Sequence, residues 1–335
     1  MGEIRREIVS GDWVIVAPER AKRPHGFLKK NKARKRGPKK GCPFEDGARE
    51  AAWPPMLQSP KKGEWRAVIV PNKYPALPHR DVCAAPIVHG PYEALTAVGS
   101  HELLITRDHN KNIADLTLAE GTQVFELLKE RYLSLAQDSC LVYATSCFNW
   151  GPLAGASVYH PHYQILTLPI IPAHVRHSFY GSARYFKMHK RCPHCVMLAY
   201  EHKEKVRVIA EDKYAIAIAP YASRQAFEVR VYPKHHWPGL EHTPKKDIES
   251  VVAMLQVSMH RIKKYLNDPD LNFFVHSAPL KGKDNYPHYH WHIEITPHLS
   301  IGAGFEFSTH VQINMIDPDT AAQVLRGGKV TGVTR

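Results

Sequence analysis

The sequence predicts an α+β fold made of two tandem halves, each a largely antiparallel sheet with one main helix. Three observations predict it. The chain has 335 residues, enough for two ordinary domains. One order of elements occurs twice: a cysteine-containing knuckle, a strand ending in histidine, a helix, a strand and a histidine-rich strand. The two histidine-rich stretches, residues 159–169 and 286–297, share a Pro-His-Tyr core and an apolar exit into proline. We therefore expect domains at residues 1–171 and 190–335.

In the first half, β-branched and apolar runs predict strands, and apolar positions at helical spacing predict one helix. The strands are expected at residues 11–20, 65–77, 102–110 and 143–149, and the helix at 116–137. A glycine-containing loop, residues 149–157, leads into the histidine-rich stretch. If that stretch is a strand, His160, His162 and Gln164 share one face, because side chains alternate along a strand.

The second half repeats this order. Strands are expected at residues 206–218, 227–236, 271–276 and 286–297, and a helix at 245–267. The strands follow one another through turns and one helical crossover, so largely antiparallel pairing is expected.

The formal charge is 45 − 32 = +13, and much of it comes from residues 29–40, where eight of twelve residues are Lys or Arg. Such a run is typical of a solvated loop, although it can also attract nucleic acid. No stretch approaches 18 consecutive apolar residues and the first residues lack an apolar signal region, so we expect a cytoplasmic protein. Six cysteines are too few for a disulfide scaffold in a chain of this size.

Two sets of residues have the composition of zinc sites. Cys192 and Cys195 form a CxxC pair that, with two of His236, His288 and His290, gives four ligands for tetrahedral Zn²⁺. The corresponding residues of the first half are Cys42, Glu45, His109 and His160, with a carboxylate in place of one thiolate. We expect a structural zinc site in the second half and a second one in the first. A metal ion on His160 would fix the strand that carries His162.

The region around His162 predicts chemistry at phosphorus. A histidine that is nucleophilic near neutral pH follows a loop containing Gly151 and Gly155, whose backbone N–H groups can approach an anion.

Several stretches resemble the galactose-1-phosphate uridylyltransferase family of the histidine-triad superfamily. They are residues 12–24, the turn 72–77, the loop 149–155 and the segment His160-Pro161-His162-Tyr163-Gln164, which is similar to the family's active-site signature. The resemblance implies two tandem histidine-triad-like halves and a ping-pong transfer of UMP from UDP-glucose to galactose 1-phosphate. In it, His162 attacks the α-phosphorus and forms a uridylyl-histidine.

The resemblance also implies roles for individual residues and an assembly. Gln164 and Ser157 would contact phosphoryl oxygens, and Asn72 the ribose. The other substrate-binding positions that it implies are Arg20, Arg23, Asn149, Gly151, Gly155, Glu306 and Gln312. Glu306 and Gln312 match the family's hexose-contacting segment. Because the family's hexose pocket is completed by the neighbouring subunit, a homodimer is implied.

The sequence departs from the family pattern at Tyr163, where glycine is usual. The stretches 42–45, 74–77 and 192–195 also resemble a neighbouring branch, the ADP-sugar phosphorylases, in which inorganic phosphate takes the nucleotidyl group. Glu306 with Gln312 favours a sugar phosphate as acceptor, and thus the uridylyltransferase. Two alternatives remain: a hydrolase of dinucleoside phosphates, which can use the same covalent histidine, and a zinc-stabilised basic nucleic-acid-binding protein.

Overall fold

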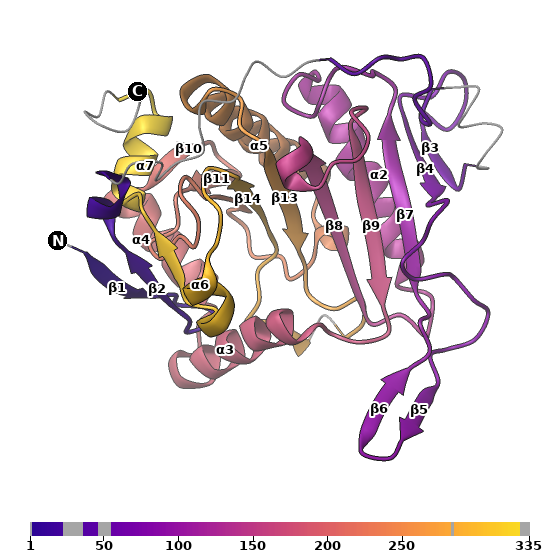
Figure 1. The fold of residues 1–335 in the computed structure, drawn as a ribbon, viewed down its shortest axis with the longest axis horizontal. Coiled ribbons are helices and arrows are strands. Elements are labelled where there is room, and N and C mark those ends of the chain that lie inside the picture. The colour runs from indigo at the N-terminus through magenta and orange to yellow at the C-terminus, as the bar shows by residue number, and fades with distance from the viewer. Residues whose placement is uncertain (1, 23–35, 46–54, 283–284, 329–335) are drawn as a thin grey trace.

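The computed structural model describes residues 2–22, 36–45, 55–282 and 285–328, and a ten-stranded sheet is its central element (Figure 1). The strands, in sheet order, are β10 (Val208–Glu211), β11 (Ala215–Ile218), β12 (Val229–Pro233), β14 (His292–Pro297), β13 (Leu271–His276), β8 (Tyr143–Trp150), β9 (His162–Leu168), β7 (Ser100–Thr106), β4 (Ala67–Pro71) and β3 (Leu57–Ser59). Every neighbouring pair in this sheet is antiparallel. The predicted fold class is confirmed.

The order of the strands repeats about the middle of the sheet. From the centre outward, one half runs β8, β9, β7, β4 and β3, and the other runs β13, β14, β12, β11 and β10. In each half a long helix comes after the strand that is third from the centre: α2 (Leu118–Leu135) after β7, and α5 (Lys245–Leu266) after β12. The two halves join where β8 pairs with β13, so their sheets form one continuous sheet.

The main core lies between this sheet and the two long helices, which pack side by side against one of its faces (Figure 1). Helix α2 begins with a capping box in which the Thr117 hydroxyl and the Glu120 carboxylate each accept an N–H from the other residue. In α5 the predicted apolar face is buried, with Ile248, Val252 and Leu255 each fully shielded from solvent. Helical spacing thus gave both long helices correctly.

Other elements were not expected from the sequence. A helix, α3 (Ala173–His189), occupies the expected linker, and the CxxC pair opens another, α4 (Pro193–Glu204). Strands β5 (Pro86–His89) and β6 (Tyr92–Leu95) form a hairpin that projects from the body (Figure 1). Cys83 and Cys140 form a disulfide near this hairpin's base. Among the described residues, none of the helices combines the length and apolar character needed to cross a bilayer.

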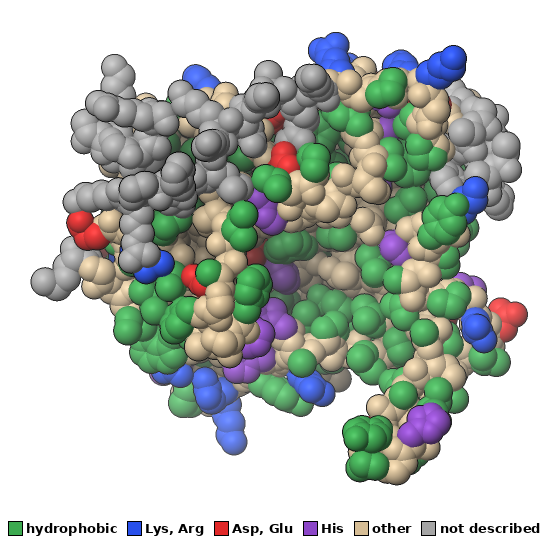
Figure 2. Space-filling model, in the orientation of Figure 1, with side chains coloured by type: hydrophobic (Ala, Val, Ile, Leu, Met, Phe, Trp, Pro, Cys, Tyr) green, Lys and Arg blue, Asp and Glu red, His purple; other side chains and the backbone are tan. Residues whose placement is uncertain are grey.

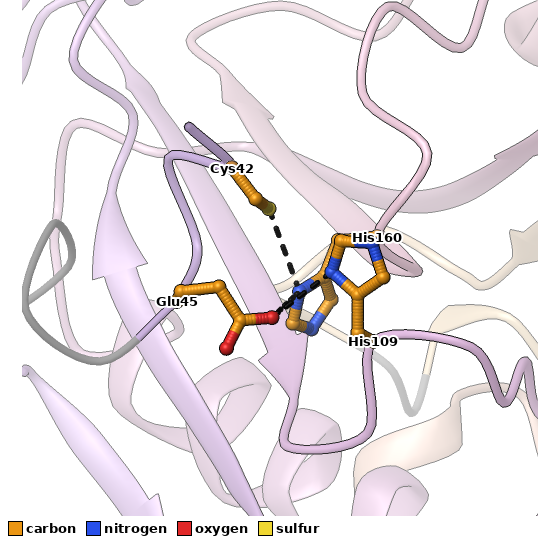
Figure 3. A group of neighbouring side chains, drawn as sticks. All are labelled: Cys42, Glu45, His109 and His160. Atoms are coloured by element: carbon orange, nitrogen blue, oxygen red, sulfur yellow. Dashed lines mark hydrogen bonds and ion pairs between the residues drawn. The ribbon is translucent and has the colours of Figure 1, made fainter. Parts of the chain in front are cut away.

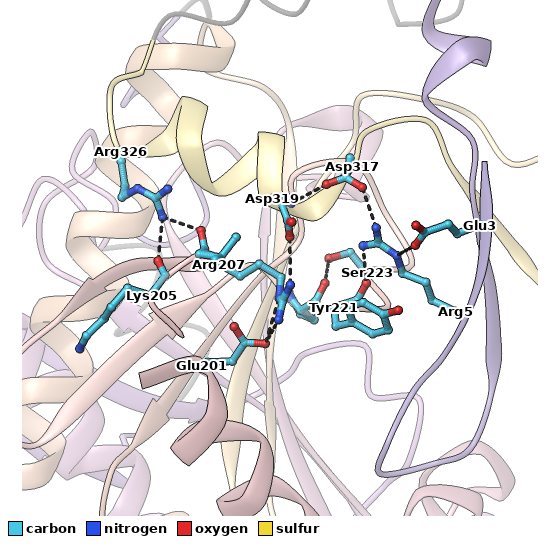
Figure 4. Close-up of polar contacts among 12 residues, drawn as sticks. Glu3, Arg5, Glu201, Lys205, Arg207, Tyr221, Ser223, Asp317, Asp319 and Arg326 are labelled. Atoms are coloured by element: carbon cyan, nitrogen blue, oxygen red, sulfur yellow. Dashed lines mark hydrogen bonds and ion pairs between the residues drawn. The ribbon is translucent and has the colours of Figure 1, made fainter. Parts of the chain in front are cut away.

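The two ends of the chain meet in a small sheet and an ion-pair network. Strand β2 (Trp13–Val16) pairs with β1 (Glu3–Arg6) and with β15 (Gln312–Asn314). Helix α7 (Pro318–Leu325) begins beside two arginines: Arg5 binds Asp317 at 2.7 Å, and Arg207 binds Asp319 at 3.0 Å (Figure 4). These contacts attach both the N-terminal strand and the C-terminal helix to the second half.

We expect Glu201→Ala to lower the free energy of unfolding by about 3 kcal/mol, because it leaves the Arg207 guanidinium buried without its main partner. Arg207 donates two hydrogen bonds to Glu201, at 2.8 and 2.9 Å, and the Glu201 side chain is only 2% exposed. Chemical denaturation measures the change. Glu204→Ala is the control, since its partner Lys203 is 83% exposed and such pairs contribute little. Equal losses in both variants would contradict this prediction.

Candidate active site

A cavity of about 530 Å³ brings together four of the predicted catalytic and substrate-binding residues. Ser157, His162 and Gln164 line it together with Asn72, which comes from the turn after β4. The other lining residues are Pro43, Phe44, Lys73, Tyr74, Leu103 and Val158. Phe44, Lys73 and Leu103 were not predicted as site residues. The first two lie inside stretches that carried the resemblance, but nothing in the sequence indicated that these stretches meet.

The backbone fixes His162 in the tautomer that a nucleophile needs. Its Nδ1–H donates to the carbonyl of His160 at 2.9 Å, which leaves the Nε2 atom with its lone pair available. Burial lowers the pKa of His162, partly offset by that hydrogen bond, so the imidazole stays neutral. The Phe44 ring packs against the imidazole in an edge-type arrangement, with 4.9 Å between the ring centroids. The His162 side chain is only 7% exposed, so these contacts hold it in one orientation.

The glycines of the predicted loop adopt backbone conformations that favour glycine. Gly151 and Gly155 flank a short 3-10 helix, residues Pro152–Ala154, with φ angles of 93° and 81°. Asn149 does not line the cavity of His162. It lies at the end of β8, where its side-chain oxygen accepts a hydrogen bond from Asn272. Arg20 lies in the 3-10 helix Pro18–Lys22, also outside the lining, and Arg23 lies outside the described residues.

The two predicted hexose-contacting residues lie elsewhere in the subunit. Gln312 lines a second cavity of about 750 Å³, shared with Asn272 and Glu294 and with histidines of α3. Glu306 lies in α6 (Gly304–Thr309), where its carboxylate accepts the N–H of Ala303. Figure 2, which views the molecule from the same side as Figure 1, shows a hollow in the middle of the surface with histidine side chains around it. Within one subunit, therefore, Glu306 and Gln312 do not line the cavity that contains His162.

The four predicted ligands of the first metal site converge on one point (Figure 3). The donor atoms of Cys42, Glu45, His109 and His160 all lie within 4.8 Å of one another. His109 and His160 each donate Nε2–H to a backbone carbonyl, of Gly37 at 3.1 Å and of Thr106 at 2.6 Å. Their Nδ1 atoms consequently face Glu45, at 3.0 and 3.7 Å. A hydrogen bond from the far ring nitrogen orients a histidine for metal binding, so these residues fit an ion.

The second metal group is similar in chemistry. Donor atoms of Cys192, Cys195 and His236 lie within 4.8 Å of one another, and the Nδ1 atom of His290 lies 3.6 Å from the Cys195 sulfur. The Nδ1 atom of His236 also faces the Cys195 sulfur, at 3.2 Å, so both imidazoles present this ring nitrogen to the thiolate pair. His288, the third histidine considered, contributes a backbone carbonyl to Cys192.

The second half also contains a counterpart of His162, and it is His292. Its Nδ1 atom lies 3.1 Å from the carbonyl of His290, as His162 lies against that of His160. Its ring is stacked on the rings of Tyr232 and His276, with 4.7 and 4.8 Å between the ring centroids. The counterpart is therefore not His288, although His288 follows proline in the shared Pro-His-Tyr letters as His162 does. Rings thus stack on His292, whereas His162 lines a cavity.

Comparison with known proteins agrees with this geometry. Residues 2–172 match the family model described as galactose-1-phosphate uridyl transferase, N-terminal domain, and residues 92–326 match a domain of unknown function. ADP-glucose phosphorylase from Arabidopsis thaliana is 30% identical over 333 residues, covering 98% of this chain and 93% of the relative. Galactose-1-phosphate uridylyltransferase from Thermotoga maritima is 27% identical, covering 98% and 99%.

Solved structures show the same similarity. A crystal structure of the Arabidopsis thaliana ADP-glucose phosphorylase with bound ADP-glucose has a TM-score of 0.84 and 28% identity, covering 98% of this chain and 100% of that one. A uridylyltransferase structure with a TM-score of 0.75 is 24% identical, covers 98% of each chain and shares the fold.

Proposed function

The chain belongs to the galactose-1-phosphate uridylyltransferase family, and on that basis we propose that it transfers a nucleotidyl group from a nucleotide sugar through a covalent intermediate on His162. The observation that carries this proposal is the fixed tautomer of His162 in a cavity with Gln164, Ser157 and Asn72. A neutral imidazole with a free Nε2 lone pair is a competent nucleophile toward phosphorus.

The reaction takes place in two displacements at the same phosphorus. In the first, Nε2 of His162 bonds to the α-phosphorus, and the bond to the sugar-phosphate oxygen breaks. Its electrons leave with the sugar 1-phosphate. In the second, an acceptor phosphate oxygen bonds to that phosphorus, and the imidazole leaves as the neutral group that it was before. Gln164 and Ser157 donate hydrogen bonds to the phosphoryl oxygens as charge develops on them.

The substrate pair that the observations favour is ADP-glucose and inorganic phosphate, giving ADP and glucose 1-phosphate. The ADP-glucose phosphorylase from Arabidopsis thaliana aligns over 98% of the chain, and its crystal structure holds ADP-glucose. Lys73 adds a cation to the lining of the cavity, which suits a small anionic acceptor. This favours the phosphorylase over the UMP transfer that Glu306 and Gln312 suggested in the sequence.

A second candidate is transfer of UMP from UDP-glucose to galactose 1-phosphate. It is favoured by the resemblance of Glu306 and Gln312 to a hexose-contacting segment. Because these residues lie outside the cavity of His162 in one subunit, this candidate requires a homodimer in which the partner brings them to the site.

We propose Zn²⁺ for both metal groups, because thiolate, imidazole and carboxylate ligands in fours suit that ion. When bound at Cys42, Glu45, His109 and His160, the ion would hold in place the start of β9, which carries His162. The carbonyl of His160, next to that metal group, is the acceptor that holds Nδ1–H of His162.

Intact-protein mass spectrometry after brief mixing with each nucleotide sugar tests the proposal. With ADP-glucose we expect a mass increase of one AMP, lost again when inorganic phosphate is added. An increase of one UMP with UDP-glucose, lost on adding galactose 1-phosphate, would instead establish the second candidate. The absence of an adduct with either donor would contradict a covalent mechanism.

A further inference from the structure

A second histidine, His101, lies directly behind the proposed active site. It is on β7, next to β9, in the register that pairs His101 with Leu166 and Leu103 with Gln164. Its side chain is outside the cavity lining, but it contacts two residues that are in it, Gln164 and Asn72. His101 is not among the site residues predicted from the sequence.

The tautomer of His101 is set by the main chain. The backbone N–H of Ala76, which can only donate, points to Nδ1 at 3.2 Å. Nδ1 must therefore accept, and the proton of the neutral ring lies on Nε2. That Nε2–H is 2.9 Å from the side-chain oxygen Oε1 of Gln164 and donates to it.

This hydrogen bond decides which end of the Gln164 amide is free. With Oε1 held by His101, the Nε2 amide group is the end left to donate to a ligand in the cavity. The opposite orientation would place two N–H donors against each other at His101 and would present an oxygen to the phosphoryl group. One hydrogen bond therefore separates a stabilising contact to the transferred phosphorus from a repulsive one.

The turn that carries Asn72 is attached to the same histidine. The N–H of Asn72 donates to the carbonyl of His101 at 2.9 Å, and the N–H of Tyr74 donates to the Asn72 side-chain oxygen at 2.9 Å. The Asn72 amide nitrogen lies close to both ring nitrogens, at 3.1 and 3.5 Å. Because Nε2 already carries a proton, the Asn72 amide does not bond to it; the turn is held to His101 by the backbone N–H groups of Asn72 and Ala76.

The second half lacks this arrangement at the equivalent positions. The residue that corresponds to Gln164 is Glu294, which has no amide to donate, and Arg230 lies 3.3 Å from it. Leu103 corresponds to Arg230, and His101 to the residue two before it, Glu228, which lies just before β12 and binds Arg230 at 2.9 Å. The histidine–glutamine pair thus occurs in the half whose nucleophile faces a cavity.

We propose that His101 is a positioning residue: its side chain fixes the amide of Gln164 as a donor to the transferred phosphoryl group, and its backbone carbonyl holds the Asn72 turn. This inference rests on the proposed nucleotidyl transfer. It predicts that His101 contributes to the rate of phosphoryl transfer and acts only through Gln164.

A double-mutant cycle on the first half-reaction tests it, with rapid-quench mass spectrometry following adduct formation from ADP-glucose, or from UDP-glucose if that is the donor that labels the wild-type protein. We expect His101→Phe to slow adduct formation by about 10²-fold, the order found for loss of one oxyanion donor. The affinity for the nucleotide sugar should change little, because the donor acts as charge develops.

Gln164→Ala should show a similar loss, and the double variant should be no slower than Gln164→Ala alone. His101→Gln, which keeps an N–H near the position of Nε2, should recover much of the rate.

His89→Phe, the same change on the exposed β5–β6 hairpin, is the matched control and should leave the rate unchanged. Thermal melting checks that each variant is folded. Losses that multiply in the double variant, or a His101→Gln protein as slow as His101→Phe, would overturn the role proposed for His101. A wild-type protein that forms no adduct would instead overturn the proposed function itself.

Discussion

Replacing His162 by alanine is expected to abolish formation of the nucleotidyl adduct and to lower overall transfer by at least about 10⁴-fold. Removal of a covalent nucleophile has effects of this size, because the remaining donors cannot replace the bond that it forms. Among the described residues, His292 is the other histidine whose Nδ1 atom lies against a histidine carbonyl, and its ring is stacked on Tyr232 and His276. Intact-protein mass spectrometry measures the adduct, and coupled detection of the sugar 1-phosphate measures turnover.

His292→Ala is the matched control for this experiment. It removes the equivalent imidazole from the second half, together with the same kind of bond to a histidine carbonyl. Thermal melting identifies the folded fraction, and the rate is expressed per folded molecule. We expect this variant to form the adduct at the wild-type rate. Transfer that survives in His162→Ala, or that is lost equally in both folded variants, would show that His162 is not the nucleophile.

Replacing Cys192 by serine is expected to have the largest effect on stability. The thiolate belongs to a group that ties the start of α4 to His236, which follows β12, and to His290, which precedes β14. A metal ion that binds the folded group stabilises the fold by its own binding free energy, which for structural zinc is on the order of 10 kcal/mol. We expect a loss of one metal ion per chain and a fall in melting temperature on the order of 10 °C or more.

Metal analysis and calorimetry on the purified protein test this prediction. Cys147→Ser is the control: this free cysteine lies on β8 and belongs to none of the donor groups found among the described residues. A chelator should lower the melting temperature of the wild-type protein towards that of Cys192→Ser and should affect the variant much less. An unchanged metal content and melting temperature in Cys192→Ser would rule out a structural metal at this site.

Much of the architecture followed from the sequence because its signals are local. Alternation along a strand put His162 and Gln164 on one face, and helical spacing placed α2 and α5. His160 was expected on the same face, but it precedes β9 and belongs to the metal group. The repeated order of elements indicated two similar halves, which the mirrored strand order confirms. The ligand set Cys42, Glu45, His109 and His160 could also be predicted, because residues with similar ligand chemistry occupy the corresponding positions of the second half.

Only the tertiary structure decided which distant residues meet. Strand order and register bring Asn72, Ser157 and His162 to one cavity, leave Gln312 in another, and set His101 behind Gln164. They also stack Tyr232 and His276 on His292, whereas its counterpart His162 lines a cavity. The physical reason is that periodicity is written in consecutive residues, whereas convergence depends on pairing between strands that lie far apart in the chain.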